Sequence, residues 1–401
     1  MPDMFSNSHL GEGSANSVAM GLDAADPGEN GGSLPRRAVS RLDWITLPLI
    51  ALCTIVMLVA GTELIVREKR LHSISTVQKC MLPSAAGLHA VPNSVCILTN
   101  SDGQRVEYRF NSCGDRTPLA CDKKPEGVYR IVLIGSSVAM GWDVSEPDTL
   151  AERLSADLSQ STQRRVEVYN SAMFGPGDLT GRVSRDIALQ PDLILWVLAS
   201  HDVDKRKMKD REREFQESPR GRRGLKEFLN MPRVAGFLRG LLYRSESAYL
   251  AAYLRNIRES AQLPENSKSE EDGRMLLFNA YVRTIVEEAK AAGAPVVATA
   301  VPNRAESDLF AMSPRPAGIS PDRLNDELHA IMVSNGATYI DVVPDLEKTP
   351  NLDGLYDQLG YHLNGNGHAV LTKILARALG CGAVPALSNG EQAQSEKMQK
   401  K

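Results

Sequence analysis

The chain has 401 residues, of which 42% are hydrophobic and 24% are charged, and its formal net charge is −3. This length accommodates either a membrane anchor with one large domain or two domains. The small net charge and the lack of any RNA- or DNA-binding motif argue against a nucleic acid partner. The sequence also contains no glycine-rich phosphate loop and no cluster of metal ligands, so we predict no cofactor.

The amino-terminal part predicts a disordered tail followed by a single transmembrane helix. Residues 1–40 are rich in Gly, Ser, Asn and Asp and show no apolar periodicity, which is typical of disorder. An uncharged run from Ile45 to Thr62 follows Trp44 and is long enough to span a bilayer, so we place the helix at 44–66. The alternatives are a cleaved signal peptide, which the long polar region before the run disfavours, and a buried core helix.

Four of the six cysteines lie in a turn-rich lead-in segment, residues 71–127, which also contains a predicted strand at 105–110. These four are Cys80, Cys96, Cys113 and Cys121. Their spacings do not match zinc ligand pairs, so they indicate two disulfides of undetermined connectivity, with four reduced core cysteines as the alternative. Basic residues flank both ends of the apolar run, so the positive-inside rule does not decide its orientation. Disulfides form in oxidising compartments, which predicts that the large domain lies outside the cytoplasm.

From residue 127 onward, strand-like and helix-like segments alternate. The five predicted strands are 128–134, 165–170, 192–198, 295–301 and 338–343. The helices between and after them are 149–160, 179–189, 275–291, 321–333 and 367–379. This alternation predicts a five-stranded parallel sheet in a three-layer α/β/α sandwich, as one domain over 128–381. A charged helical insertion at 203–272 follows the third strand, and 382–401 is predicted to be a disordered tail.

Polar or glycine-bearing turns follow four of these strands, at the sheet edge where open α/β proteins bind ligands. The turns carry Ser137 after the first strand, Gly175 after the second, His201 after the third and His362 after the fifth. A serine hydroxyl becomes a nucleophile when a histidine accepts its proton, which His362 is placed to do. The backbone N–H groups of Ser137 and Gly175, with the side chain of His201, are predicted to stabilise an oxyanion.

These residues carry a resemblance to the SGNH/GDSL hydrolase superfamily over residues 130–379. Gly135-Ser136-Ser137 falls on the family's Gly-Asp-Ser block, so the resemblance implies that Ser137 is the nucleophile. Gly175 falls on the oxyanion glycine, and His362 falls on the base of the Asp-x-x-His block. The block Gly-x-Asn-Asp corresponds to residues 199–202. The lead-in from Glu107 through Arg116 also resembles bacterial members with an amino-terminal anchor, many of which are linked to cell-surface or exported polysaccharide.

Three positions depart from the family pattern. Ser136 replaces the usual Asp, and His201 stands where the oxyanion Asn belongs. The residue three before His362 is Leu359 rather than Asp, so we predict Asp357 as the acid that orients the imidazole. Asp353 is a weaker alternative for this role. If neither carboxylate reaches the ring, the site is a Ser–His dyad or the protein is inactive.

The resemblance implies a serine-dependent ester hydrolase or acyl transferase of the SGNH type that acts on O-acyl esters. The expected substrate is an O-acetyl group on a carbohydrate of the cell envelope or of an exported polysaccharide. The expected location is the bacterial inner membrane, with a single span and a periplasmic domain. The alternative function is a catalytically inactive SGNH-like binding or assembly subunit of an envelope polysaccharide system, with the helical insertion as its partner surface.

Overall fold

The computed structural model describes ten segments of the chain. They are 43–84, 87–100, 104–173, 179–199, 202–203, 248, 250–255, 266–317, 321–357 and 362–388. The predicted tail at 1–40, most of the predicted helical insertion, Gly175 and His201 lie outside these residues. The chain divides into two compact units, residues 1–57 and 58–401.

The first described element is the long helix α1 (Asp43–Cys80). Its stretch Trp44–Thr62 has a mean hydropathy of 2.3, and none of the stretch is buried within the structure. By length and composition this stretch can cross a membrane, a criterion that a signal sequence or a buried core helix also meets. The helix continues well beyond the predicted end at residue 66, up to the first of the paired cysteines.

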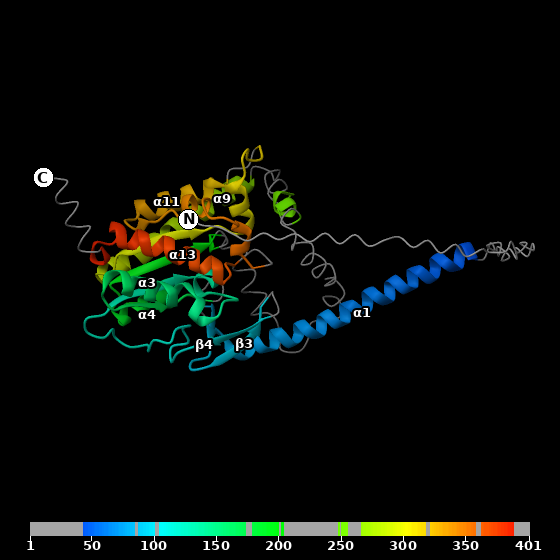
Figure 1. The fold of residues 1–401 in the computed structure, drawn as a ribbon, viewed down its shortest axis with the longest axis horizontal. Helices are drawn as coiled ribbons and strands as arrows, with labels where there is room; N and C mark the ends of the chain where they lie inside the picture. The colour runs from blue at the N-terminus through cyan, green and yellow to red at the C-terminus, as the bar shows by residue number, and fades with distance from the viewer. Residues whose placement is uncertain are drawn as a thin grey trace, which may run out of the picture. The chain divides into compact units, whose positions relative to one another are not determined.

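The centre of the larger unit is a five-stranded parallel sheet (Figure 1). Its strands are β5 (Tyr129–Gly135), β6 (Val166–Asn170), β7 (Leu193–Ala199), β8 (Val296–Val301) and β9 (Thr338–Tyr339). Their spatial order is β6-β5-β7-β8-β9, and every neighbouring pair is parallel. Every residue of β5, β6, β7 and β8 is buried, as is expected of strands covered on both faces. The charged residues Arg130 of β5 and Glu167 of β6 pair with each other in this interior. The predicted fold class is therefore confirmed.

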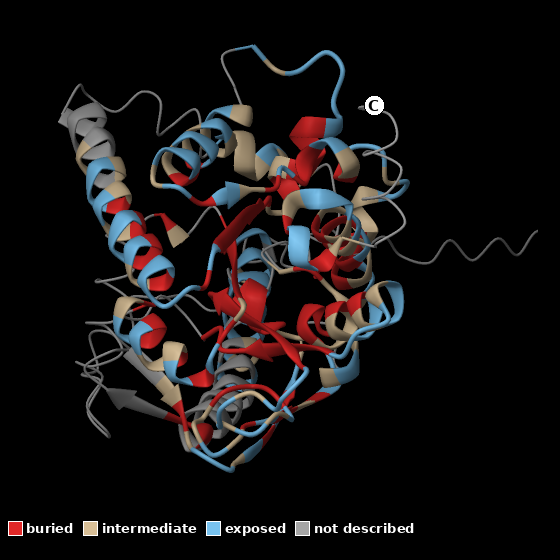
Figure 2. Ribbon diagram, turned by 90° about the vertical axis from the view of Figure 1, so that its left-hand side faces the viewer, coloured by how far each residue is buried: buried red, intermediate tan, exposed pale blue. Residues whose placement is uncertain are grey.

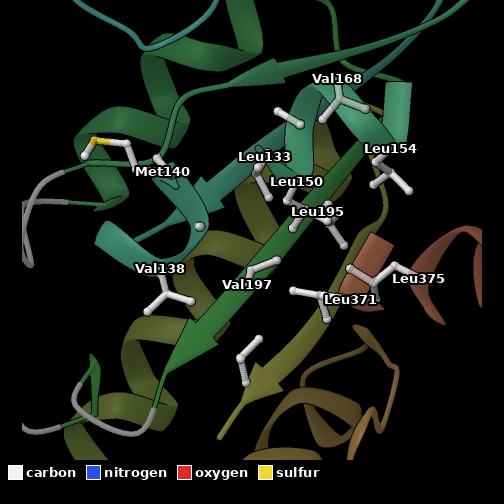
Figure 3. Close-up of a cluster of buried hydrophobic side chains, with 14 of the residues drawn as sticks. Leu133, Val138, Met140, Leu150, Leu154, Val168, Leu195, Val197, Leu371 and Leu375 are labelled. Atoms are coloured by element: carbon white, nitrogen blue, oxygen red, sulfur yellow. The ribbon is translucent and has the colours of Figure 1, made fainter. Parts of the chain in front are cut away.

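Two apolar cores, one on each face of the sheet, make the three layers; the strands appear red between the helices in Figure 2. One face is covered by α2 (Ser137–Met140), α3 (Leu150–Thr162) and α13 (Gly365–Ala378). The other is covered by α4 (Leu179–Asp186), α9 (Asn266–Ala291) and α11 (Asp322–Ser334). Figure 3 shows part of the first core: Leu133, Leu195 and Val197 of the strands, Leu150 and Leu154 of α3, and Leu371 and Leu375 of α13.

The lead-in forms two antiparallel hairpins that pack on the first of these cores. Their strands are β1 (Met81–Ser84), β2 (Gly87–Ala90), β3 (Val95–Thr99) and β4 (Arg105–Arg109). Only β4 was expected. β1 and β2 have four residues each, and β3 (Val-Cys-Ile-Leu-Thr) alternates in burial although its sequence does not alternate between apolar and polar residues. The prediction of two disulfides is confirmed, with Cys80 joined to Cys96 and Cys113 joined to Cys121.

Several element boundaries differ from the predicted ones. The fifth strand stops at Tyr339, and α12 (Val343–Leu346) begins where the strand was expected to end. Pro344 has no N–H for a sheet ladder, and the Asp341 side chain accepts the Val343 N–H at 3.0 Å. Helix α10 (Arg304–Ala311) was not predicted, although Asn303 and Glu306 form a capping box at its start.

Short helical turns complete the described elements. They are η1 (Glu146–Asp148), η2 (Ile187–Leu189), η4 (Leu352–Leu355), η5 (Leu379–Ala383) and η6 (Pro385–Leu387). The last two extend regular structure to Leu387, so part of the predicted tail at 382–401 forms a helical turn. The residues after 388 lie outside the described part of the chain.

Candidate active site

The turn between β5 and α2 brings Ser137 to the carboxyl edge of the sheet. Gly135 ends the strand with φ +148°, and a Cβ there would lie 2.3 Å from the carbonyl oxygen of Val197 on the neighbouring strand. Only glycine therefore allows β5 and β7 to approach so closely at this turn. Ser137 opens α2 and is 8% exposed, so its hydroxyl lies at the surface of the core rather than in bulk solvent.

The two adjacent serines of this turn have different partners. The Ser136 hydroxyl donates a hydrogen bond to Asp202 Oδ2 at 3.0 Å, and the same oxygen accepts the N–H of Ala199 at 2.8 Å. Ser136 therefore joins the end of β5 to the end of β7. The Ser137 hydroxyl instead lies 2.9 Å from Nε2 of His362, across 225 positions of sequence. This contact distinguishes Ser137 from Ser136 as the hydroxyl that a base can activate.

His362 lies between Ser137 and a carboxylate. Its Nδ1 is 3.4 Å from Asp357 Oδ2, and the side chains of His362 and Asp357 are 19% and 5% exposed. The backbone fixes the pair, because the Asp357 N–H donates to the His362 carbonyl at 2.9 Å. The alternative acid, Asp353, forms an ion pair with Arg304. The structure thus brings Ser137 and Asp357 to the two ring nitrogens of His362 and gives Asp353 another partner.

Asn364 holds the histidine turn against the last helix, a role that the sequence analysis did not identify. Its side-chain oxygen accepts the N–H groups of Asn366 and Gly367 at 2.9 and 3.1 Å, which caps α13. Its amide donates to the carbonyls of Gly354 and Tyr356 at 2.9 and 3.0 Å. The signal that could have revealed it is an Asn directly before a helix, the preferred N-cap residue.

His368, six residues after His362, is a structural residue rather than a second base. Its Nδ1 accepts the backbone N–H of Leu150 at 3.0 Å, and its side chain is fully buried. Burial, followed by the positive charge of Arg116, lowers the pKa of His368 to about 3. The ring is therefore neutral at physiological pH, which suits its role as a hydrogen-bond acceptor that joins α13 to α3.

The turn after β6 lies beside the serine turn. The N–H of Met173 donates to the carbonyl of Gly135 at 3.1 Å, and the Asn170 amide donates to the carbonyl of Met140 at 3.3 Å. Gly175, two residues further on, and His201 lie outside the described residues. Their oxyanion roles therefore stay predictions.

The polar groups of the described residues at this sheet edge suit acyl transfer. Within these residues, no group of three or more His, Cys, Asp or Glu side chains is arranged to hold a metal ion. A hydroxyl within 2.9 Å of an imidazole, with a carboxylate 3.4 Å from the other ring nitrogen, is an arrangement that can serve general-base activation of the hydroxyl.

Comparisons with known proteins returned similar solved structures only. No family model matches this chain, and no curated protein matches it. The lipase/acylhydrolase from Enterococcus faecalis is similar at 15% identity, covering 63% of this chain and 95% of that chain, with a TM-score of 0.37. The psychrotrophic esterase EstA from Pseudoalteromonas sp. is similar at 10% identity, covering 62% and 96%, with a TM-score of 0.35.

A third similar structure is a member of the lipolytic protein G-D-S-L family from Veillonella parvula. It is 13% identical, the match covers 63% of this chain and 96% of that chain, and the TM-score is 0.34. At these identities and scores the activities of the similar proteins do not transfer to this chain. The chemistry of the site is therefore judged from the contacts of Ser137, His362 and Asp357 themselves.

Proposed function

We propose that this chain is an SGNH-type serine ester hydrolase or acyl transferase, with Ser137 as nucleophile, His362 as base and Asp357 as the orienting acid. The observation that carries the proposal is the 2.9 Å contact between the Ser137 hydroxyl and His362 Nε2, with a buried carboxylate behind the ring. A hydroxyl and an imidazole at this distance are in hydrogen-bond reach, which general-base activation requires.

The reaction proceeds in two half-reactions. His362 Nε2 takes the Ser137 proton while the serine oxygen attacks the carbonyl carbon of the ester, and the imidazolium then protonates the departing alcohol. Water or a sugar hydroxyl next attacks the acyl-serine and gives its proton to His362, which passes it to the departing Ser137 oxygen, and the acid or the new ester is released. Asp357 stabilises the imidazolium from the Nδ1 side. The backbone N–H groups of Ser137 and Gly175, with the His201 side chain, are the proposed donors to the oxyanion.

The proposed substrates are O-acyl esters, above all O-acetyl groups on carbohydrate of the cell envelope or of an exported polysaccharide. The proposed location is the bacterial inner membrane, with α1 as a single span and the larger unit in the periplasm. Two observations support this location: the apolar stretch Trp44–Thr62 and the two disulfides, which persist in oxidising compartments. The esterase and the transferase share the first half-reaction and differ only in the acceptor.

The Ser137–His362 contact also bears on the alternative, an inactive binding or assembly subunit. A protein without catalytic function has no need to keep a serine hydroxyl, an imidazole and a carboxylate in line. The three departures from the family pattern gave this alternative its support. One departure was the lack of an Asp three residues before His362. Asp357, five residues before, lies 3.4 Å from His362 Nδ1, which supports the proposed enzyme.

Labelling with a fluorophosphonate probe tests the proposal, because the probe forms a covalent bond with an activated serine. We expect the wild-type chain to label and Ser137→Ala not to label. Ser136→Ala is the matched control, since it removes the neighbouring hydroxyl that faces Asp202, and it should retain labelling. An unlabelled wild type, or equal labelling of Ser137→Ala, would contradict the proposal.

Acetate release from O-acetylated polysaccharide, measured with and without an added sugar acceptor, then distinguishes the two activities. Hydrolysis releases acetate in both conditions. Transfer moves the acetyl group to the acceptor and releases little acetate. Labelling by the probe without turnover of any acetylated carbohydrate would retain Ser137 as nucleophile and reject the proposed substrate class.

A further inference from the structure

The lead-in contains a small closed loop, here called the clamp loop, which comprises residues 113–121. The Cys113–Cys121 disulfide closes it. Asn111 stabilises it from outside, because its side-chain oxygen accepts the N–H groups of Cys113 and Asp115 at 2.9 and 3.0 Å. The Asn111 amide donates to the carbonyl of Leu119 at 3.0 Å. The disulfide and Asn111 together fix the backbone from which the next two side chains extend.

Arg116 of the clamp loop reaches the turn that follows Ser137. Its guanidinium donates to the carbonyls of Met140 at 3.2 Å and Val144 at 2.6 Å, and also to that of Gly141. These carbonyls belong to the end of α2 and the residues directly after it, and Ser137 is the first residue of that helix. Arg116 is only 2% exposed, so these carbonyls replace water as hydrogen-bond partners of its charge.

The ring of Tyr108 supports the same turn from the lead-in side. The Arg116 guanidinium carbon lies 4.1 Å from the ring centroid, a cation–π distance. The Tyr108 hydroxyl accepts the N–H of Asp143 at 2.8 Å. Tyr108 is 1% exposed. The segment 140–144 is therefore held at four backbone positions by two buried side chains of the lead-in.

Asp115, the neighbour of Arg116, contacts the turn after β6 through two arginines of α4. It is 1% exposed and accepts hydrogen bonds from Tyr169 at 2.8 Å, Arg182 at 2.9 Å and Arg185 at 2.9 Å. Arg182 also donates to the carbonyl of Ser171 at 2.6 Å, and Arg185 donates to its hydroxyl at 2.9 Å. Ser171 is the first residue after β6, the strand whose turn leads to the proposed oxyanion glycine.

We infer that the clamp loop positions the reacting groups of this site: Arg116 holds the turn that carries Ser137, and Asp115 holds the turn that leads to Gly175. Neither residue touches the reacting atoms, so both are positioning residues. Their opposite charges suit their targets, since Arg116 faces backbone carbonyls and Asp115 faces two arginines. This inference rests on the proposed function for its effect on the reaction, and on the contacts alone for the holding of residues 140–144.

The test compares Arg116→Lys with Arg109→Lys in the full chain solubilised in detergent. A lysine keeps the charge but lacks the forked donors that reach several carbonyls at once. Arg109 is the control because it lies in the same lead-in, and its side chain is 64% exposed and pairs with Glu107. Two measurements are made: the saturating rate and half-saturation concentration of fluorophosphonate labelling, and amide hydrogen exchange of residues 137–144.

We expect Arg116→Lys to lower the saturating labelling rate about 10- to 100-fold, because a small displacement of a nucleophile is costly, while half-saturation stays unchanged. Exchange of residues 137–144 should accelerate in Arg116→Lys, whereas exchange of α3 and α13 should not change. Arg109→Lys should match the wild type in both measurements. Unchanged exchange at 137–144 in folded Arg116→Lys would overturn the inference, as would an unchanged saturating rate.

The double variant Cys113→Ala with Cys121→Ala keeps the test decisive if Arg116→Lys does not fold. It opens the clamp loop but retains Asp115, Arg116 and all their partners. It should accelerate exchange at 137–144 and lower the saturating labelling rate; wild-type values for both would overturn the inference. A wild type that does not label contradicts the proposed function instead, and hydrogen exchange then decides the holding role by itself.

Discussion

The central sheet and the lead-in contribute to the site by different physical means. Strands β5 to β8 are wholly buried and mostly apolar, and hydrophobic burial places their carboxyl ends, with Ser137, at one edge. The lead-in holds the turns at that edge with a disulfide and with buried charges, Asp115 and Arg116. The sheet therefore determines which residues meet, and the lead-in determines how firmly the turns that carry them are held.

The largest expected effect concerns the acid behind His362. We expect Asp357→Asn to lower the rate of ester hydrolysis or probe labelling by about 10³- to 10⁴-fold, because the orienting acid of a serine protease contributes this much. Asp353→Asn is the control, since Asp353 pairs with Arg304, and it should change the rate less than about 10-fold. Similar losses in both variants would show that the 3.4 Å contact does not orient the base.

The next effect tests the buried charges of the lead-in. Asp115→Asn leaves Arg182 and Arg185 without their shared carboxylate, and we expect the free energy of unfolding to fall by about 3–5 kcal/mol. Glu107→Gln, which removes a partly exposed ion pair with Arg109, should cost less than about 1 kcal/mol. Urea unfolding of the solubilised chain measures both. A cost for Asp115→Asn as small as that of Glu107→Gln would mean that the lead-in is only an accessory to the sheet.

A glycine substitution tests the close approach of β5 and β7 in the sheet, again through the free energy of unfolding. Gly135→Ala should lower the free energy of unfolding by about 3 kcal/mol, because a Cβ there would lie 2.3 Å from the Val197 carbonyl and the backbone has φ +148°. Gly127→Ala is the matched control: φ is +78°, but no atom lies within 4 Å of the added Cβ. It should cost about 1 kcal/mol. Equal costs would show that β5 and β7 can separate at this turn without penalty.

The smallest expected effect is a pH dependence from His368. Its folded pKa of about 3 lies below the unfolded value of 6.5, so the unfolded chain binds more protons between these values. The stabilising contribution is therefore complete above pH 6.5 and is lost as pH falls toward 3. Between pH 7.5 and 5.0 we expect wild type to lose about 2 kcal/mol more than His368→Gln. Equal losses in the two proteins, measured by urea unfolding at both pH values, would contradict this assignment.

The sequence by itself determined the fold class and the candidates at the sheet edge. Apolar runs of strand length alternate with helical periodicity, and parallel strands place the residues after them at one edge; both signals are local. The same local reasoning failed at the ends of elements. At β9 the strand was predicted to continue to residue 343, but Pro344 cannot join a sheet ladder and Asp341 accepts the Val343 N–H, so a helical turn begins there. The roles of Ser137, His362 and Asp357 stay proposals, although the structure brings the three side chains together.

The tertiary structure alone decided which partner each polar group takes. The sequence offered Asp357 and Asp353 for one role, and only the turn that joins Asp357 to the His362 backbone brings the former to the ring. The tertiary structure also determined which of the four cysteines pair with each other. Arg116 gave no signal as a positioning residue, because its carbonyl partners lie 24 to 28 positions away and carry no side-chain pattern. Such contacts depend on the approach of distant segments in the folded chain, which no local periodicity encodes.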